Sequence, residues 1–330
     1  MLNNWINLQD LARLREKLCR GEWRKIFKKI FSSARSKTRS AWEHTENPPI
    51  NAWDIPALRR HWDEKVSGDA KIDHVDFVCK RFLSGKKGLA AFSPGCGTGG
   101  IEKRWAETGL FKRIDAIDLS PSRIARAAAA AGQSGLAGIL NFRVADMGSV
   151  SGESRYDLVI AEGALHHLCP MRPMLQKLER LLKPGGLLVV NDFVGPSRFQ
   201  WAGRQLQAAN ALLALIPEAY RLRWPPGRGG IKRRIVAPGR LRMKLADPSE
   251  AAESSRILPL LSEMFTPLEI KDKGGAIACL VFYEIAHHYI QADETAEEIL
   301  RLCFAVEDLL MKSGEISSDY ILGVFQKKQA

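Results

Sequence analysis

A glycine-rich turn stands between a short apolar segment and the start of a helical pattern in this 330-residue chain. Residues 88–100 read Gly-Leu-Ala-Ala-Phe-Ser-Pro-Gly-Cys-Gly-Thr-Gly-Gly. Glycine reaches positive φ and lets the backbone approach a ligand closely, so we predict a strand–loop–helix unit for a nucleotide-like ligand. From the spacing alone, a dinucleotide-binding site remains an alternative, because Gly95, Gly97 and Gly100 also fit G-x-G-x-x-G. Asp118 would then be the ribose ligand.

The chain after this turn alternates between short apolar segments and helical patterns. Apolar segments rich in β-branched residues follow at residues 113–120, 140–146, 156–161 and 187–192. Helical patterns separate them at residues 122–131 and 171–182, and Lys-Pro-Gly-Gly at residues 183–186 ends the second helix. This alternation predicts a parallel, doubly wound α/β sheet that binds its ligands at the carboxyl ends of the strands.

Acidic residues stand at or just beyond four of the predicted strand ends: Asp118, Asp146, Glu162 and Asp192. With their surroundings they resemble the class I S-adenosylmethionine-dependent methyltransferases. The resemblance rests on residues 93–99, on Asp118, on Ala-Asp-Met at 145–147, on Ala-Glu-Gly-Ala-Leu-His-His-Leu at 161–168 and on Leu-Leu-Lys-Pro-Gly-Gly-Leu-Leu at 181–188. Leu-His-His-Leu followed by Lys-Pro-Gly-Gly is not expected in a dehydrogenase.

The resemblance covers roughly residues 50–195 and implies a doubly wound, seven-stranded Rossmann-like sheet. Residues 320–327 look like the final antiparallel strand that such sheets insert at one edge. The implied cofactor is S-adenosylmethionine, with glycine backbone against its methionine part. Asp118 would accept hydrogen bonds from both ribose hydroxyls, and Asp146 would accept one from the adenine amino group.

The residues that we expect at the cofactor are Ser93, Gly95, Cys96, Gly97, Asp118, Leu119, Asp146, Met147 and Glu162. Met147 would offer the adenine ring a soft apolar contact. One position departs from the family pattern, because Ser93 stands where these enzymes usually carry an acid. A hydroxyl can still form a hydrogen bond, but the ammonium group of the cofactor loses a countercharge. Glu162 is the expected replacement.

Two adjacent histidines follow the fourth predicted strand. His166 and His167 stand where a base would meet the methyl group, and Asp192 would orient one imidazole and stabilise its charged form. Methyl transfer from a sulfonium is an in-line displacement, so a base helps when the acceptor is a hydroxyl. The alternative is that one histidine packs on the sheet and only its neighbour faces the cleft. A second pair, His287 and His288, is expected to have a packing role on a helix.

Composition indicates a cytoplasmic enzyme without a metal or disulfide framework. The six cysteines are scattered with no C-x-x-C pair, which favours reduced thiols over disulfides or zinc. No segment resembles a signal peptide, and the longest late apolar run, residues 276–282, is too short to span a bilayer. We therefore predict no metal site.

The net charge of +12 is concentrated near the N-terminus, where residues 1–40 carry eleven Lys or Arg and three acids. An apolar stripe with helical spacing, flanked by basic residues, runs through residues 23–31. This pattern is typical of a helix on an anionic membrane surface, which would place the protein at the inner membrane face. The alternatives are packing on the protein's own body and nucleic-acid binding, for which no recognition motif is present.

We divide the chain into a basic amphipathic extension (1–45), a cofactor-binding core (46–195), a basic lid over the substrate (196–256) and the end of the sheet with a helical insertion (257–330). Residues 221–244 carry nine Lys or Arg and no acid, which suits an anionic acceptor, although a solvated loop has the same composition. The oligomeric state is not indicated.

Two segments, residues 191–201 and 247–256, resemble a bacterial methyltransferase subgroup often associated with glycosyltransferases. That similarity implies O-methylation of a sugar or glycan hydroxyl. The other candidates are methylation of a small secondary metabolite and a non-catalytic cofactor-binding partner subunit. The cofactor residues together with His166, His167 and Asp192 count against the last of these.

Overall fold

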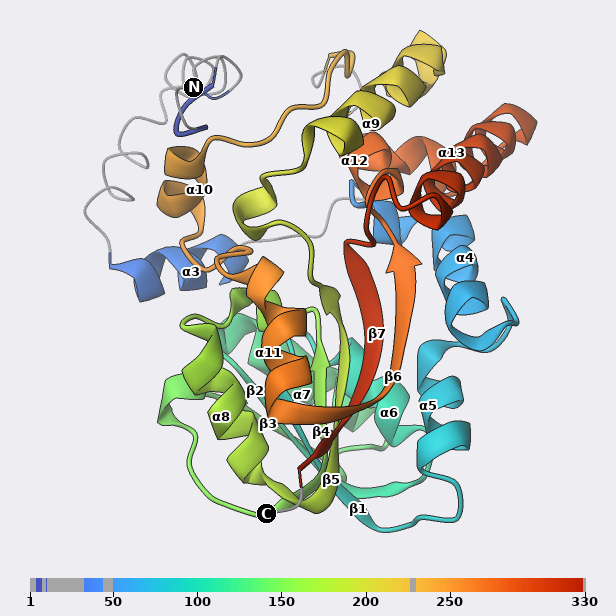
Figure 1. Cartoon of the computed structure of the whole chain (residues 1–330). Coiled ribbons are helices and arrows are strands. Elements are labelled where there is room, and N and C mark those ends of the chain that lie inside the picture. The colour runs from blue at the N-terminus through green and yellow to red at the C-terminus, as the bar shows by residue number, and fades with distance from the viewer. Residues whose placement is uncertain (1–3, 8–9, 11–32, 44–49, 226–229, 329–330) are drawn as a thin grey trace.

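The computed structural model describes residues 4–7, 10, 33–43, 50–225 and 230–328. A twisted sheet flanked by helices forms the lower half of the molecule in Figure 1, and a group of helices lies above the carboxyl ends of its strands. The apolar stripe predicted at residues 23–31 lies outside the described residues.

The sheet has seven strands in the order β3-β2-β1-β4-β5-β7-β6. The strands are β1 (Leu89–Pro94), β2 (Phe111–Asp118), β3 (Leu140–Val144), β4 (Tyr156–Glu162), β5 (Leu182–Phe193), β6 (Phe265–Gly274) and β7 (Tyr320–Lys327). Strands β1 to β5 are parallel, whereas β7 runs antiparallel to both of its neighbours. The predicted seven-stranded, doubly wound α/β fold is confirmed.

The last strand is antiparallel as predicted, but it lies one position in from the edge of the sheet, between β5 and β6. Strand β6 forms the edge itself. Its sequence, Phe-Thr-Pro-Leu-Glu-Ile-Lys-Asp-Lys-Gly, lacks the apolar run of the central strands, and most of its first eight residues are at least partly exposed. Charged side chains on an edge strand oppose pairing with other chains, which explains this composition.

Helices cover both faces of the sheet. On one face lie α8 (Met171–Leu181) and α11 (Ile257–Met264), and their apolar residues form one core with β4 and β5. The opposite core takes side chains from α4 (Pro56–Ser67), α5 (His74–Phe82), α6 (Gly100–Ala106) and α7 (Pro121–Gln133). Successive strand residues alternate between the two cores, so Phe92 faces α8 and Ala91 faces the other layer.

A separate hydrophobic core lies in the helical half, which we call the cap and define as residues 203–235 and 276–316. It is built from α9 (Gly203–Leu215), α12 (Ala278–Phe282) and α13 (Glu294–Lys312), with residues 52–62 packed against them. Helix α9 is followed by a short 3-10 segment at Glu218–Arg221. The core of the cap therefore combines a segment from before the strands with segments between β5 and β6 and between β6 and β7.

The other helices in the described part of the chain are α3 (Ala34–Glu43) and α10 (Arg240–Ala246), which contact each other. The 3-10 segments are η1 (Ala52–Asp54), η2 (Met147–Ser149), η3 (Leu165–His167), η4 (Ser197–Phe199), η5 (Glu218–Arg221), η6 (Ser254–Arg256) and η7 (Ala286–Tyr289). His287 and His288 thus lie in a 3-10 segment rather than in the predicted longer helix. Within the described ranges, no helix has the length and apolar character needed to cross a bilayer.

Several cations of the predicted basic lid interact within the protein. The Nζ of Lys232 donates to the carbonyls of Leu280, Val281 and Tyr283, and this side chain is buried. Arg223 pairs with Glu284. The charge that these groups offer to an acceptor is therefore smaller than the sequence suggests.

Candidate functional site

The glycine-rich turn follows β1 and holds a tight, left-handed backbone. Gly95 and Gly97 have φ of 67° and 55°, a region that favours glycine. A Cβ on Gly95 would lie 3.1 Å from the Cβ of Ala164, so the turn also needs a residue without a side chain. The Cys96 N–H donates to the carbonyl of Ile117 at 3.0 Å, which ties the turn to β2.

Asp118 ends β2 and fixes the turn from the other side. Its Oδ2 accepts from the Gly97 N–H at 3.0 Å, and its Oδ1 accepts from the Ser120 N–H at 2.8 Å. Each carboxylate oxygen keeps a second lone pair for a ligand hydroxyl. The expected ribose role of Asp118 is compatible with this geometry and stays a prediction.

A cavity of about 380 Å³ adjoins these strand ends. Leu119, Val144 and Ala145 line it from β2, β3 and the loops after them, while Ser36 and Arg39 line it from α3. The N-terminal extension therefore contributes to the wall of the expected cofactor region through α3, which the sequence did not indicate.

Asp146 and Met147 follow β3, as expected for the residues beside an adenine ring. The Oδ1 of Asp146 accepts from the Gly148 N–H at 2.6 Å and so begins the 3-10 segment η2. Met147 is buried in the same core as Phe92. The adenine contacts of both residues remain predictions.

Ser93 reaches a second acid that sequence reasoning missed. Its hydroxyl donates to Oε1 of Glu102 at 2.5 Å, and Glu102 is 1% exposed. The other carboxylate oxygen of Glu102 has no hydrogen-bond partner among the described residues. Burial raises the pKa of Glu102 to about 7, with the Ser93 hydrogen bond acting in the opposite direction. The available signal was its position, because Glu102 lies in the first turn of α6, directly after the glycine-rich turn.

Glu162, the expected countercharge for the cofactor, lies in a buried network. Its oxygens accept from Nε1 of Trp105 at 2.6 Å and from Nδ2 of Asn191 at 3.0 Å, and they lie 2.7 Å from Nε2 of His74. Burial would raise the pKa of Glu162, but the nearby His74 and these hydrogen bonds lower it to about 2. The carboxylate is therefore charged and already engaged, and its contact with a cofactor ammonium stays a prediction.

The network continues to the edge strand. The buried Nζ of Lys273 donates to Oδ1 of Asn191 at 2.7 Å and lies 4.4 Å from the ring centroid of Trp62. Burial lowers the pKa of Lys273 to about 8, while Glu162 acts against this shift. The network connects α5, β4, β5 and β6 beneath the cap.

Asp192 and His166 form a close pair at the ends of β5 and β4. Nδ1 of His166 lies 2.5 Å from Oδ1 of Asp192, a fully buried carboxylate. The backbone N–H groups of Ala164 and Leu165 donate to Oδ2 of Asp192 at 2.9 and 2.6 Å. The predicted orienting role therefore has a geometric basis, and His166 is the oriented member.

His167 lies beside His166, with ring centroids 4.0 Å apart. Its Nδ1 is 3.2 Å from the hydroxyl of Ser249, and Glu250 faces both imidazoles. Neither Ser249 nor Glu250 was predicted as a site residue. They belong to a turn far along the sequence, and no local motif marks them.

The electrostatic surroundings shift the pKa values of the two imidazoles in opposite directions. Burial would lower the pKa of His166, but Asp192 and then Glu250 raise it to about 9. Burial and the neighbouring His166 hold the pKa of His167 well below its usual value. Burial raises the pKa of Glu250, and His166 opposes that shift.

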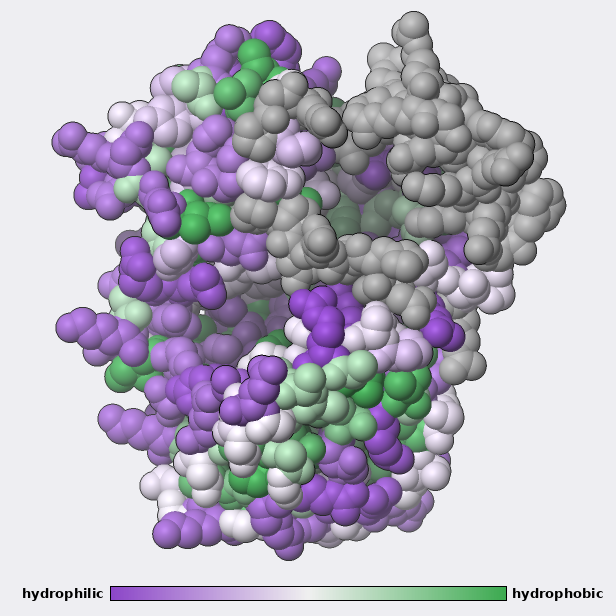
Figure 2. Space-filling model, turned by 180° about the vertical axis from the view of Figure 1, so that it is seen from behind, coloured by the Kyte–Doolittle hydropathy of each residue, from purple (hydrophilic) through white to green (hydrophobic). Residues whose placement is uncertain are grey.

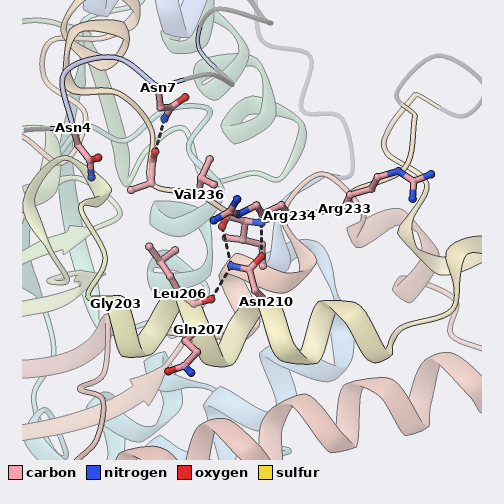
Figure 3. Close-up of a pocket in the computed structure, with 11 residues that line it drawn as sticks. Asn4, Asn7, Gly203, Leu206, Gln207, Asn210, Arg233, Arg234 and Val236 are labelled. Atoms are coloured by element: carbon pink, nitrogen blue, oxygen red, sulfur yellow. Dashed lines mark hydrogen bonds between the residues drawn. The ribbon is translucent and has the colours of Figure 1, made fainter. Parts of the chain in front are cut away.

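A larger cavity of about 670 Å³ lies away from the strand ends. It lies between α9 and residues 233–237, and Asn4 and Asn7 contribute to its wall (Figure 3). Asn210 from α9 bonds the backbone of Ile235 at this wall through both its amide nitrogen and its oxygen. Seen from behind, the surface is also indented between the sheet half and the cap, and hydrophilic residues predominate around that indentation (Figure 2).

Comparison with known proteins agrees with this geometry. Residues 94–188 match a family model described as a methyltransferase domain. The ubiquinone biosynthesis O-methyltransferase of Caulobacter vibrioides is 31% identical over 161 residues, which are 48% of this chain and 58% of that protein. The trans-aconitate 2-methyltransferase of Streptomyces avermitilis is 34% identical over 151 residues, or 45% of this chain and 54% of that protein. The chain thus spans less than two thirds of the length of these relatives.

Among solved structures, geranyl diphosphate C-methyltransferase from Streptomyces coelicolor, which has S-adenosyl-L-homocysteine bound, superposes with a TM-score of 0.52. The two proteins share 12% sequence identity, and the match covers 90% of this chain and 99% of the other. The chain has the class I methyltransferase fold. The predicted cofactor of this domain, S-adenosylmethionine, is therefore supported by the domain match and by the fold together.

Proposed function

We propose that the protein is an S-adenosylmethionine-dependent methyltransferase that O-methylates a hydroxyl group. The single observation that carries the proposal is the His166–Asp192 pair, which lies at the same strand ends as the glycine-rich turn and Asp118. A non-catalytic cofactor-binding subunit would have no use for an imidazole oriented in this way.

Methyl transfer requires the protein mainly to position the methyl donor and the acceptor. The acceptor oxygen attacks the methyl carbon in line with the departing sulfur, so both molecules must be held in one geometry. An alcohol also has to lose its proton, and a side chain within hydrogen-bond reach of it increases the rate. In our proposal His167, whose low pKa keeps its imidazole neutral, receives that proton, and Asp192 holds the neighbouring His166 in place.

For the acceptor we propose a sugar or glycan hydroxyl. The likeness of residues 191–201 and 247–256 to methyltransferases associated with glycosyltransferases supports this choice, and the second segment places Glu250 beside the histidines. The second candidate is a small metabolite, which the names of the relatives favour. Residues 1–40 would bring the enzyme to an anionic membrane surface where lipid-linked glycans are made.

The test is a mass-spectrometric screen in which protein and S-adenosylmethionine are incubated with sugars, lipid-linked glycans and small phenolic or carboxylic metabolites. We expect a gain of one methylene on a sugar hydroxyl together with release of S-adenosylhomocysteine. Methylation of a nitrogen or carbon atom would contradict O-methylation, and methylation of the small metabolites alone would favour the second candidate. A variant lacking residues 1–32 should keep its activity and lose co-sedimentation with anionic vesicles, whereas unchanged co-sedimentation would reject the membrane role.

A further inference from the structure

Three side chains that commonly bind metal ions converge beside the strand ends. His166 and His167 lie in η3 after β4, whereas Glu250 lies between β5 and β6. The Nε2 of His166 is 3.7 Å from Oε1 of Glu250, and the Nε2 of His167 is 3.9 Å from Oε2. One ligand atom from each side chain lies within 4.8 Å of the other two, and the described part of the chain holds no second group of this kind.

Hydrogen bonds fix which nitrogen of each neutral imidazole can bind a cation. An ionised carboxylate only accepts hydrogen bonds, so Nδ1 of His166 donates to Asp192 and its Nε2 carries the lone pair. The Ser249 hydroxyl donates to Asp247 at 2.7 Å, so its oxygen accepts from Nδ1 of His167. Both Nε2 atoms therefore face the carboxylate of Glu250, and binding of a cation there would release the proton that the charged form of His166 carries.

The surroundings hold Glu250 in this position. Arg198 adopts a left-handed backbone conformation with φ of 58°, and its guanidinium donates to the carbonyls of Pro248 and Glu250 at 2.6 and 3.0 Å. Its own N–H donates to the carbonyl of Ala251 at 2.6 Å. The turn is thus fixed through its backbone, which leaves the Glu250 side chain to face the histidines.

We propose that His166, His167 and Glu250 bind one divalent transition-metal ion. Two imidazoles and one carboxylate suit Zn²⁺, Mn²⁺ or Fe²⁺, whereas Mg²⁺ and Ca²⁺ prefer sites made of oxygen ligands. Asp192 would act as the carboxylate that orients a metal-binding histidine from behind. Three protein ligands leave coordination positions open for an acceptor oxygen.

This inference refines the proposed function and rests on it in one respect, because both place the acceptor oxygen beside the side chains of His166, His167 and Glu250. Coordination to a cation makes a hydroxyl more acidic, so the ion would do the work that the proposed function gives to the histidines as a base. The histidines would then hold the ion. Binding of the ion and transfer of the methyl group are separate measurements, so each proposal can fail alone.

The experiment titrates Zn²⁺ and Mn²⁺ into chelator-treated, tag-free protein by calorimetry, and the bound metal is counted after equilibrium dialysis. We expect one ion per chain. Glu250→Gln keeps both imidazoles and should weaken binding at least tenfold. Asp192→Asn should weaken it by roughly 10–100-fold, the usual effect of a partner behind a metal-binding histidine. Glu263→Gln is the matched control, because Glu263 pairs with Arg172 on the surface, and it should bind like the wild type.

Absence of binding in the wild type, or equal affinity of the wild type and Glu250→Gln, would overturn the metal proposal. S-adenosylmethionine binding is measured in the same preparations. Full methyl transfer by metal-free protein would overturn the role of the ion in activating the acceptor and would leave the histidines as the base. Metal binding without any S-adenosylmethionine binding would support the metal site and reject the methyltransferase function.

Discussion

The sheet half and the cap of this protein are both well packed, but the sequence encodes them in different ways. In the sheet half, three of the parallel pairs join strands that are consecutive along the chain, namely β1 with β2, β2 with β3 and β4 with β5. The cap core instead joins residues 52–62 to α9, α12 and α13. Local patterns are thus sufficient to define the sheet half, whereas the cap depends on contacts between distant segments.

The strongest test is at the histidines, where the strand ends meet the distant turn that carries Ser249 and Glu250. His166→Ala and His167→Ala should each lower kcat by roughly 10²–10⁴-fold, since each removes a group that receives a proton or holds a cation. Affinity for S-adenosylmethionine should change little, because the glycine-rich turn and Asp118 remain. Steady-state kinetics and calorimetry measure the two effects. Near-normal turnover in both variants would show that positioning alone accounts for catalysis.

Equivalent core truncations compare the two halves directly. Phe282 in the cap and Phe325 in β7 are both fully buried, so Phe282→Ala and Phe325→Ala should each cost about 3–5 kcal/mol of stability. At a temperature where both variants remain folded, only Phe325→Ala should weaken cofactor binding. Thermal unfolding and calorimetry are the measurements. Equal losses of affinity would mean that the cap and the sheet act as one cooperative unit at the cofactor site.

A smaller effect is expected at Asp118 in the sheet half. Asp118→Asn retains the shape of the side chain and removes its charge, so S-adenosylmethionine binding should weaken by about 1.5–3 kcal/mol, the range for hydrogen bonds to a charged group. Asp272→Asn, on the edge strand, is a charge-matched control. Unchanged affinity in folded Asp118→Asn protein would remove this residue from the cofactor site.

The smallest effect concerns the buried acid behind the glycine-rich turn. The folded-state pKa of Glu102 is raised to about 7, so its stabilising contribution is present at low pH and is lost as the pH rises through 7. Glu102→Gln should therefore be more stable than the wild type at pH 8 by about 1–3 kcal/mol, with little difference at pH 5. Denaturant unfolding at both pH values measures this. A variant that is less stable at pH 8 would show that the charged form of Glu102 is needed in the fold.

The sequence was sufficient to predict the sheet, the glycine-rich turn and the pairing of Asp192 with one of the two histidines, because each rests on a strand end followed by a short turn. It was not sufficient for Glu250, which reaches the histidines only because Arg198 fixes a distant turn. It also left β6 unspecified, since an exposed edge strand with alternating charges has no buried apolar run. Lys232 looked like a solvent-exposed cation, and its burial depends on carbonyls 48 or more residues away.

The position of β7 between β5 and β6 has a consequence for the order in which the chain can fold. During synthesis β6 emerges well before β7, with α12 and α13 between them, yet β6 has no strand to pair with until residues 320–327 are available. The open edge of β5 persists for the same interval. Unpaired strand edges are sites of aggregation, so the growing chain is most exposed to misassembly in this window. The charged side chains of β6 lower that risk while the sheet is incomplete.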